Sequence, residues 1–228
     1  MRRDRPAAGV LRLRFDRPER RNALDRPVVL ALLDAFAAPE EPVVLLGSTT
    51  PVAFCAGADL RLADEERAAV SDLLYELYAR MTACDAIVVA ALDGPAVGGG
   101  AQLAIAADLR VAAPGATIRV AGPGHGLAVA AWGLPSLVGR GRAMDLCLTM
   151  RAVGAQEALA IGLVDRVADD AAAAALALAT ELATLDSAAA ARVKHVAWRA
   201  ARAIDALGAE RAGNRAAWTG SMAGAGRG

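Results

Sequence analysis

Short apolar runs, each followed by a loop of small residues and a helix-like segment, constrain this fold more than any other feature of the sequence. Residues 43–47 and 86–92 have the length and near-continuous hydrophobicity of strands buried on both faces. Residues 64–84, between them, carry apolar side chains at helical spacing. Strands that alternate with helices predict an α/β fold with mostly parallel pairing.

The same patterns assign the rest of the chain. From residue 169 onward the pattern is entirely helical, and residues 220–228 are too rich in glycine to be ordered without help. We therefore divide the chain into a core, residues 1–168, and a C-terminal helical region, residues 169–228. Within the core we expect strands at residues 10–15, 108–113, 117–120 and 163–167, and helices at residues 26–38, from residue 99, and at residues 128–138, 142–150 and 155–161.

Composition excludes several classes of function. The chain has 228 residues with 25 basic and 25 acidic side chains, so we expect one globular domain with a small appendage, and neither a nucleic-acid nor a membrane partner. The basic N-terminus leads into no apolar run of signal-peptide length. Cys55, Cys84 and Cys147 are odd in number and widely spaced, which favours reduced thiols in a cytoplasmic protein over a metal site.

Two loops of small residues hold most of the functional information. Residues 54–60 (Phe-Cys-Ala-Gly-Ala-Asp-Leu) and 94–103 (Gly-Pro-Ala-Val-Gly-Gly-Gly-Ala-Gln-Leu) each follow a predicted buried strand. Small residues let backbone N–H groups approach a ligand, and a helix N-terminus supplies N–H groups without partners. Two such donors that converge on one oxygen form an oxyanion hole for acyl chemistry.

Each loop alone also has a plainer interpretation. Glycine after a strand often only completes a tight turn into a helix. A dinucleotide-binding fingerprint does not fit, because residues 94–103 do not match Gly-x-Gly-x-x-Gly and do not open the chain. A phosphate-binding P-loop would need Gly-Lys-Ser/Thr, which the sequence lacks.

Taken together, the loops make the sequence resemble the crotonase (enoyl-CoA hydratase/isomerase) family. Four further segments match the family in order, residues 17–24, 106–112, 143–149 and 158–167. The resemblance implies a crotonase-like spiral of ββα units whose core holds a thioester site, and a C-terminal helical region that assembles a homotrimer or a dimer of trimers. It also implies an acyl-CoA substrate, so that coenzyme A is part of the substrate and no separate cofactor or metal is needed.

The resemblance assigns site residues as well. The oxyanion donors fall on the backbone N–H groups of Ala58 and Gly99. For Arg21 two interpretations stay open, a partner for a phosphate or a solvated side chain. For Trp132 the alternatives are a wall of the acyl chamber or the core. The positions that fall in the family's substrate-binding region are Arg21, Asn22, Ala23, Ala56, Asp59, Leu60, Gly98, Gly122 and Trp132.

The sequence departs from the family at the catalytic acids. Family hydratases place and activate water with two glutamates, and the corresponding positions here are Gln102 and Gly122. No Asp or Glu lies between Asp108 and Asp145, and glutamine does not transfer protons. In that stretch His125 is the one side chain of a type that titrates near neutral pH, so it is either the proton carrier or a structural loop residue.

Two hypotheses about function follow. The first is an enzyme that stabilises a thioester enolate in its oxyanion hole, as a decarboxylase, isomerase or dehydratase and not as a standard hydratase. The second is a non-catalytic thioester-binding or scaffolding relative. Because the chain lacks the family's usual ending after Trp218, a carrier-protein thioester is a credible substitute for coenzyme A. Cys55 has no histidine near it in sequence, which favours packing over a nucleophilic role.

Overall fold

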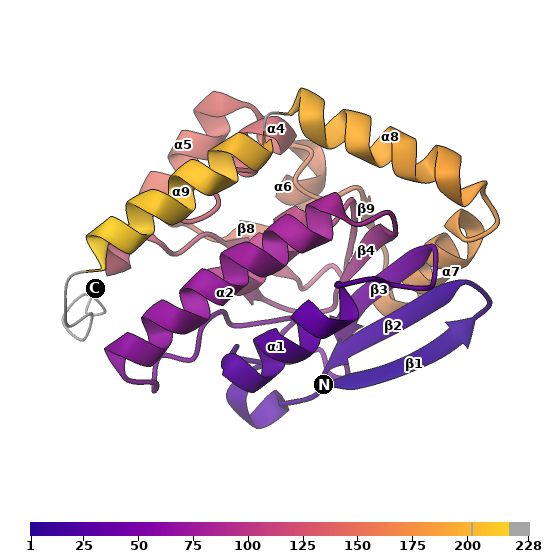
Figure 1. Ribbon diagram of the computed structural model, residues 1–228, viewed down its shortest axis with the longest axis horizontal. Coiled ribbons are helices and arrows are strands. Elements are labelled where there is room, and N and C mark those ends of the chain that lie inside the picture. The colour runs from indigo at the N-terminus through magenta and orange to yellow at the C-terminus, as the bar shows by residue number, and fades with distance from the viewer. Residues whose placement is uncertain (202, 219–228) are drawn as a thin grey trace.

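The computed structural model describes residues 1–201 and 203–218 and shows a mixed α/β architecture with two sheets (Figure 1). In the larger sheet only the first two strands pair antiparallel, and every other pair is parallel. The predicted α/β class with mostly parallel pairing is confirmed. In spatial order the strands of this sheet are β1 (Arg2–Ala7), β2 (Val10–Phe15), β3 (Val43–Ser48), β4 (Ile87–Leu92), β6 (Leu109–Ala112) and β9 (Arg166–Val167).

Helices connect and cover these strands, and a smaller sheet stands beside them. The smaller sheet contains β5 (Ala96–Val97), β7 (Thr117–Arg119) and β8 (Val153–Gly154). Two short 3-10 helices are η1 (Pro18–Arg20) and η2 (Pro123–His125). The α-helices are α1 (Arg26–Ala35), α2 (Asp64–Ala83), α3 (Gly99–Ala106), α4 (Leu134–Val138), α5 (Arg140–Thr149), α6 (Ala155–Ala160), α7 (Ala171–Leu182), α8 (Ser187–Ala200) and α9 (Ala203–Ala217).

The central strand β3 is buried on both faces because helices cover the sheet on both sides. Val43 and Leu45 pack in one apolar cluster with residues of α7, whereas Val44 and Leu46 belong to the larger cluster with α1 and α2. Successive side chains of a strand point to opposite faces, so a continuous apolar run is what such a strand requires. This is the pattern that the sequence shows.

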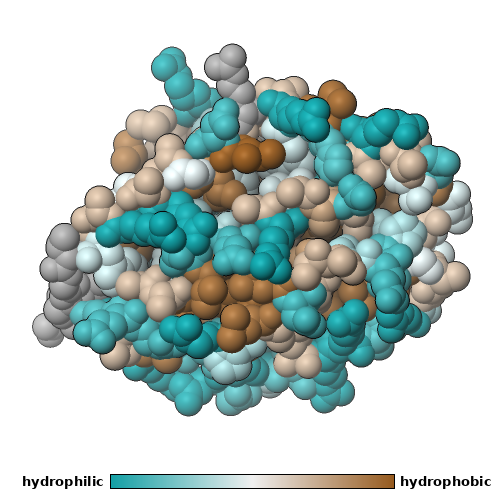
Figure 2. Space-filling view, in the orientation of Figure 1, coloured by the Kyte–Doolittle hydropathy of each residue, from teal (hydrophilic) through white to brown (hydrophobic). Residues whose placement is uncertain are grey.

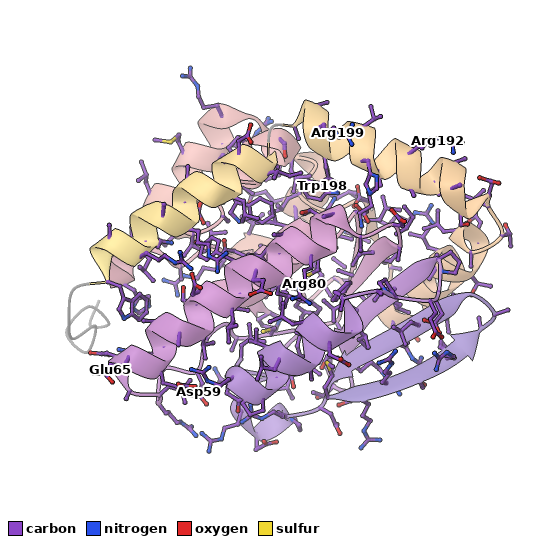
Figure 3. The ribbon with its side chains drawn as sticks, in the orientation of Figure 1. Asp59, Glu65, Arg80, Arg192, Trp198 and Arg199 are labelled. Carbon is purple, nitrogen blue, oxygen red and sulfur yellow. The ribbon has the colours of Figure 1, made fainter. Side chains whose placement is uncertain are left out.

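The C-terminal helices α8 and α9 close the molecule on the side of α2. Figure 1 shows α9 running along α2, and the two helices are in contact. Figure 3 shows Trp198 reaching from α8 towards the interior, while Arg192 and Arg199 of the same helix are exposed. The division at residue 168 stays a prediction, and residues 220–228 lie outside the described residues.

One predicted helix is wrong in part, and one strand was not predicted. Residues 128–133 are not helical, and the helix begins only at Leu134. Ala130 has a positive φ of 65°, which an α-helix does not allow, and nearby backbone N–H groups donate to side chains instead of to the preceding turn. The strand β1 was not expected, because its charged residues hide the pattern of an edge strand.

The surface in the view of Figure 2 alternates hydrophilic bands with separate hydrophobic patches. Among the large apolar side chains that are exposed, Val193 and Val196 of α8 are 72% and 65% exposed. In the described part of the chain no single helix has the length and hydropathy to span a membrane, although α7 and α8 pass that test as a pair bent by 113°.

Candidate functional site

The two glycine-bearing loops lie against each other through their backbones. Cys55 N donates to Pro95 O at 3.2 Å, and Val97 N donates to Cys55 O at 2.9 Å. Close approach depends on glycine at Gly100, where a Cβ atom would lie 2.2 Å from Cys55 O. It also depends on Gly57, where a Cβ would lie 2.7 Å from Val97 O. The sequence therefore brings the start of α3 directly onto the first loop.

Ala58 and Gly99 present backbone N–H groups that donate to no other described residue. The neighbours of Ala58 are held by hydrogen bonds between Leu24 N and Gly57 O and between Asp59 N and Leu24 O. Gly99 is the first residue of α3, where the N–H groups of the first turn have no intrahelical acceptor. A Cβ on Gly57 would lie 3.1 Å from Gly99 N, so the two amide groups are close together.

Both amides line a cavity of about 150 Å³. Seven of the residues assigned from the sequence share this wall, and they come from both loops and from η2. These are Ala56, Ala58, Leu60, Gly98, Gly99, Gln102 and His125. The assigned residues that are not part of the wall are Arg21, Asn22, Ala23, Asp59, Gly122 and Trp132.

The side chain of Asn22 is used within the fold. It is 1% exposed, accepts from Arg17 N at 2.8 Å, and donates from Nδ2 to Ser48 Oγ at 2.9 Å and to Ala53 O at 2.8 Å. These bonds hold the segment before α1 to the first loop. The neighbouring Arg21 has a positive φ of 49° and an exposed side chain that makes no ion pair with a described residue.

Cys55 and Asp59 also have structural partners. The Cys55 thiol is fully buried and donates to Asn22 O at 3.2 Å, and burial raises its pKa to about 12. A thiol that stays protonated is a poor nucleophile, which agrees with the packing interpretation. Asp59 Oδ1 accepts from Arg61 N at 3.0 Å, and Oδ2 lies 3.7 Å from Arg20 Nη1. In Figure 3 Asp59 lies below the first turns of α2, on the side of α1.

Gln102 is bound to the non-helical segment before α4. Its Oε1 accepts from Ala130 N at 3.1 Å and from Trp132 Nε1 at 2.9 Å. Trp132 is 3% exposed and stacks between Tyr78 and Trp198, with ring centroids 6.0 and 6.2 Å away. Of the two interpretations of Trp132, the structure favours the core.

Position 122 has no room for a side chain. A Cβ on Gly122 would lie 2.6 Å from Leu127 O and 2.6 Å from a methyl group of Val129. The loop after η2 therefore packs into the space that an acidic side chain would need. His125, at the end of η2, is half-buried, and its imidazole makes no hydrogen bond with a described residue.

A buried polar cluster on α9 was not predicted from the sequence. Glu210 is 8% exposed and accepts from Tyr75 Oη at 2.7 Å, Ala130 N at 3.1 Å and Trp132 N at 3.0 Å. Asn214 is 6% exposed and donates to Tyr75 Oη at 2.7 Å. Tyr75 and Asn214 both line the cavity.

The sequence does carry a signal for this cluster. The buried residues of α9 are Ala203, Leu207, Glu210 and Asn214, which follow the spacing of one helical face. Two polar residues on a face that otherwise packs inward mark a buried hydrogen-bonded site. No group of three or more His, Cys, Asp or Glu suited to a metal ion occurs among the residues that the structure describes.

Comparison with known proteins identifies the family. The family model described as enoyl-CoA hydratase/isomerase matches residues 5–222. A probable enoyl-CoA hydratase, echA6, of Mycobacterium tuberculosis is 41% identical over 168 residues, which cover 71% of this chain and 68% of that protein. Enoyl-CoA hydratase domain-containing protein 2 of Bos taurus is 36% identical over 171 residues, which cover 70% and 58%.

Solved structures agree with this result. An enoyl-CoA hydratase/isomerase from Mycobacterium paratuberculosis has a TM-score of 0.86 at 25% identity, with 96% of this chain and 94% of that chain covered. A monofunctional enoyl CoA isomerase from M. smegmatis has a TM-score of 0.73 at 28% identity, with 87% and 92% covered. The crotonase fold predicted from the two loops is confirmed, and the chain belongs to the enoyl-CoA hydratase/isomerase family.

Proposed function

We propose that this protein binds an acyl thioester and stabilises its enolate between the backbone N–H groups of Ala58 and Gly99. The observation that carries the proposal is that these two amides are close together, have no acceptor among the described residues, and line one cavity. Removal of one such donor in acyl-transfer enzymes costs about 3–4 kcal/mol of transition-state stabilisation. Backbone donors of this kind need no titratable residue.

Simple hydration of an enoyl thioester is not the reaction that this site favours. The oxygen of Gln102 already accepts two hydrogen bonds, and position 122 has no room for a carboxylate. Activation of water needs a base within hydrogen-bonding reach. We propose His125 as a proton carrier, because it lines the cavity and its imidazole has no partner among the described residues.

Isomerisation and decarboxylation of an acyl thioester also pass through an enolate, and they fit this site better. Dehydration is the reverse of hydration, so it would depend on His125 to carry the proton. Decarboxylation of a malonyl thioester needs the least help, because the bond between the α-carbon and the carboxylate breaks, its electron pair forms the enolate, and no base has to remove a proton. The solved relative from M. smegmatis is a monofunctional isomerase, which supports a proton-transfer reaction as a candidate for this chain.

A panel of thioesters tests the proposal. Acyl-, enoyl- and malonyl-coenzyme A compounds are incubated with the protein in deuterium oxide, and deuterium at the α-carbon is followed by NMR. An enolising site incorporates deuterium, or releases carbon dioxide from the malonyl compound. Thioesters on a carrier-protein phosphopantetheine form a second arm, because coenzyme A and a carrier protein present the same thioester.

Binding without chemistry is the second candidate. The polar side chains of Gln102, Glu210 and Asn214 all bond to the segment of residues 128–132, so they fix the segment that supplies Val129 to the cavity wall. A protein that binds acyl thioesters at micromolar concentration but neither exchanges deuterium nor decarboxylates the malonyl compound would be a thioester-binding relative. That result would contradict the proposed enolate chemistry.

We also propose a homotrimer or a dimer of trimers. Exposed apolar side chains lie on the C-terminal region, namely Leu185, Val193, Val196 and Ile204 at 54%, 72%, 65% and 48% exposure. Several such residues on one part of a surface favour association with other copies. Light scattering should give a mass three or six times that of the chain, and a monomer at micromolar concentration would contradict it.

A further inference from the structure

Tyr75 and Glu210 form a pair that joins the cavity to a buried carboxylate. Tyr75, on α2, lines the same cavity as the Ala58 and Gly99 amides. Its hydroxyl lies 2.7 Å from Glu210 Oε1, and Glu210 lies behind it on α9. The residues that meet here are 135 positions apart in the sequence.

The direction of the hydrogen bonds around the Tyr75 hydroxyl follows from Asn214. Asn214 Oδ1 accepts from Ala128 N at 2.8 Å, so its amide group must turn Nδ2 towards Tyr75, to which it donates at 2.7 Å. A phenol has one proton to donate. That proton goes to Glu210 at 2.7 Å and not to the more distant Ala128 O at 3.3 Å. Tyr75 thus accepts on one side and donates to Glu210 on the other.

Glu210 is a carboxylate without a counter-ion. It makes no ion pair with a described residue, although it accepts hydrogen bonds from Tyr75, Ala130 and Trp132. Burial raises the pKa of Glu210, while the hydrogen bonds from Tyr75 and the backbone lower it. A carboxylate with a raised pKa is a stronger base than an exposed one. An unpaired buried charge is also costly, so its presence beside a ligand cavity calls for a function.

We propose that Tyr75 is a catalytic residue that relays the α-proton of a bound acyl thioester to Glu210, which is the base of the pair. The α-carbon–hydrogen bond breaks, its electron pair forms the enolate, and the proton goes to Tyr75 Oη. The phenolic proton of Tyr75 moves to Glu210 Oε1 at the same time. The negative charge leaves Glu210 and ends on the thioester oxygen beside Ala58 and Gly99. The relay rests on the proposed enolate chemistry and adds a second proton carrier to His125.

Other titratable groups near Tyr75 and Glu210 stay neutral, are paired with an opposite charge, or line the cavity. Burial, helped by the charge of Glu210, raises the pKa of Cys147 on α5 to about 11. Burial also raises the pKa of Tyr78 on α2 well above its usual range. Asp72 of α2 binds Arg211 and Arg215 of α9, beside a second cavity that Tyr75 and Asn214 also line. In the cavity wall Arg67 pairs with Asp64, and His125 is the remaining group there whose type titrates near neutral pH.

The test measures α-deuterium exchange of a saturated acyl-coenzyme A in wild-type protein, Tyr75→Phe and Glu210→Gln. Tyr75→Phe removes only the hydroxyl, and Glu210→Gln keeps the size but cannot take a proton. We expect both variants to lose about 10²–10⁴-fold in exchange rate. Arg211→Gln is the matched control, because it removes an ion pair that holds α9 to α2 and Arg211 makes no hydrogen bond with Tyr75 or Glu210. It should exchange at near the wild-type rate.

The pH profile separates the relay from a structural role. Wild-type exchange should rise with pH as Glu210 loses its proton, above the range of an ordinary glutamate. This rise should persist in His125→Ala and vanish in Tyr75→Phe and Glu210→Gln, while thioester affinity stays within a few-fold of wild type. The relay alone would be overturned if Tyr75→Phe exchanged deuterium within a few-fold of the wild-type rate. It would also be overturned if the exchange rate of Tyr75→Phe fell only as much as its affinity for the thioester. Wild-type protein that decarboxylates a malonyl thioester but exchanges no α-deuterium would also overturn the relay alone. Wild-type protein that binds thioesters with neither reaction would overturn the enolate proposal as well.

Discussion

The two glycine-bearing loops and the two C-terminal helices α8 and α9 are held to the core by different means. The loops, residues 54–60 and 94–103, join through backbone hydrogen bonds at positions where only small residues fit. The helices join through buried polar side chains, Lys194 on α8 and Glu210 and Asn214 on α9. The first kind of contact is specified by local sequence, whereas the second needs partners more than 75 positions away.

The largest expected effect on stability comes from the anchor of α8. Lys194 Nζ donates to Met81 O at 2.8 Å and Ala86 O at 2.7 Å, and lies 3.0 Å from Asp108 Oδ2. Lys194→Met should destabilise the fold by about 3–5 kcal/mol, because it leaves the Asp108 carboxylate without its cation and two carbonyls without this donor. Urea unfolding measures the change.

Arg192→Met is the matched control for Lys194→Met, because it removes an exposed cation from the same helix (Figure 3). It should leave the unfolding midpoint nearly unchanged. Equal midpoints for the two variants would show that the buried contacts of Lys194 contribute nothing, and α8 would then not differ from the loops in how it is held.

The next effect concerns the backbone donors of the loops. Gly99→Pro removes one N–H at the first position of α3, where proline fits a helix. If Gly99 N–H stabilises the enolate, deuterium exchange should fall about 10²–10³-fold. Gly99→Ala keeps the N–H and reproduces the crowding of the proline Cβ, which would lie 3.2 Å from the Leu74 side chain. Equal rates for the proline and alanine variants would remove Gly99 from the oxyanion hole.

This difference between the regions explains how much could be predicted from sequence. The buried strands β3 and β4, helix α2 and the small-residue loops follow from local patterns, and the structure has them near the predicted positions. Glycine at position 122 was correctly interpreted from the sequence as the absence of an acidic side chain, and the structure has no space for one there.

What local patterns missed depends on distant partners. Residues 128–133 have the composition of a helix, but their N–H groups bond to Gln102, Glu210 and Asn214. A window of neighbouring residues does not contain those acceptors. Glu210 was not predicted for the same reason. It lies in the C-terminal region of the sequence, outside residues 108–145, and only the fold places it beside the cavity.

A smaller effect tests whether Gln102 acts as a hydrogen-bond acceptor in the wall. Gln102→Met keeps the volume but leaves the buried Trp132 Nε1 without its acceptor, so it should cost about 1–3 kcal/mol in unfolding free energy. Trp132→Phe removes the donor instead. The double variant should cost less than the sum of the two single ones, because no unpaired donor remains. Strictly additive costs would show that this bond does not hold the wall.

The smallest expected effect on stability concerns the ion pairs between α2 and α9. Asp72 on α2 binds Arg211 through Oδ1 and Oδ2 at 2.7 and 2.6 Å, and also binds Arg215. The hydrogen bonds from Arg211 and Arg215 hold the pKa of Asp72 well below its usual range. Because the Asp72 and Arg211 side chains are each 30% exposed, Asp72→Asn should cost at most about 1 kcal/mol at pH 7.

The pH dependence has a definite sign. A carboxyl whose pKa is lowered by folding stabilises the folded state above its unfolded pKa, about 3.9 for Asp, and this contribution is lost as the pH falls through the folded value. The difference in unfolding free energy between wild type and Asp72→Asn should therefore shrink below about pH 4, and also in high salt.

Glu66→Gln is the control for Asp72→Asn, because it breaks an exposed pair with Arg26 that does not involve α9. It should leave the amide hydrogen exchange of α9 unchanged, whereas Asp72→Asn should make that exchange faster. If the difference for Asp72→Asn grew in acid, or α9 exchanged no faster, the buried residues alone would hold this helix against the cavity.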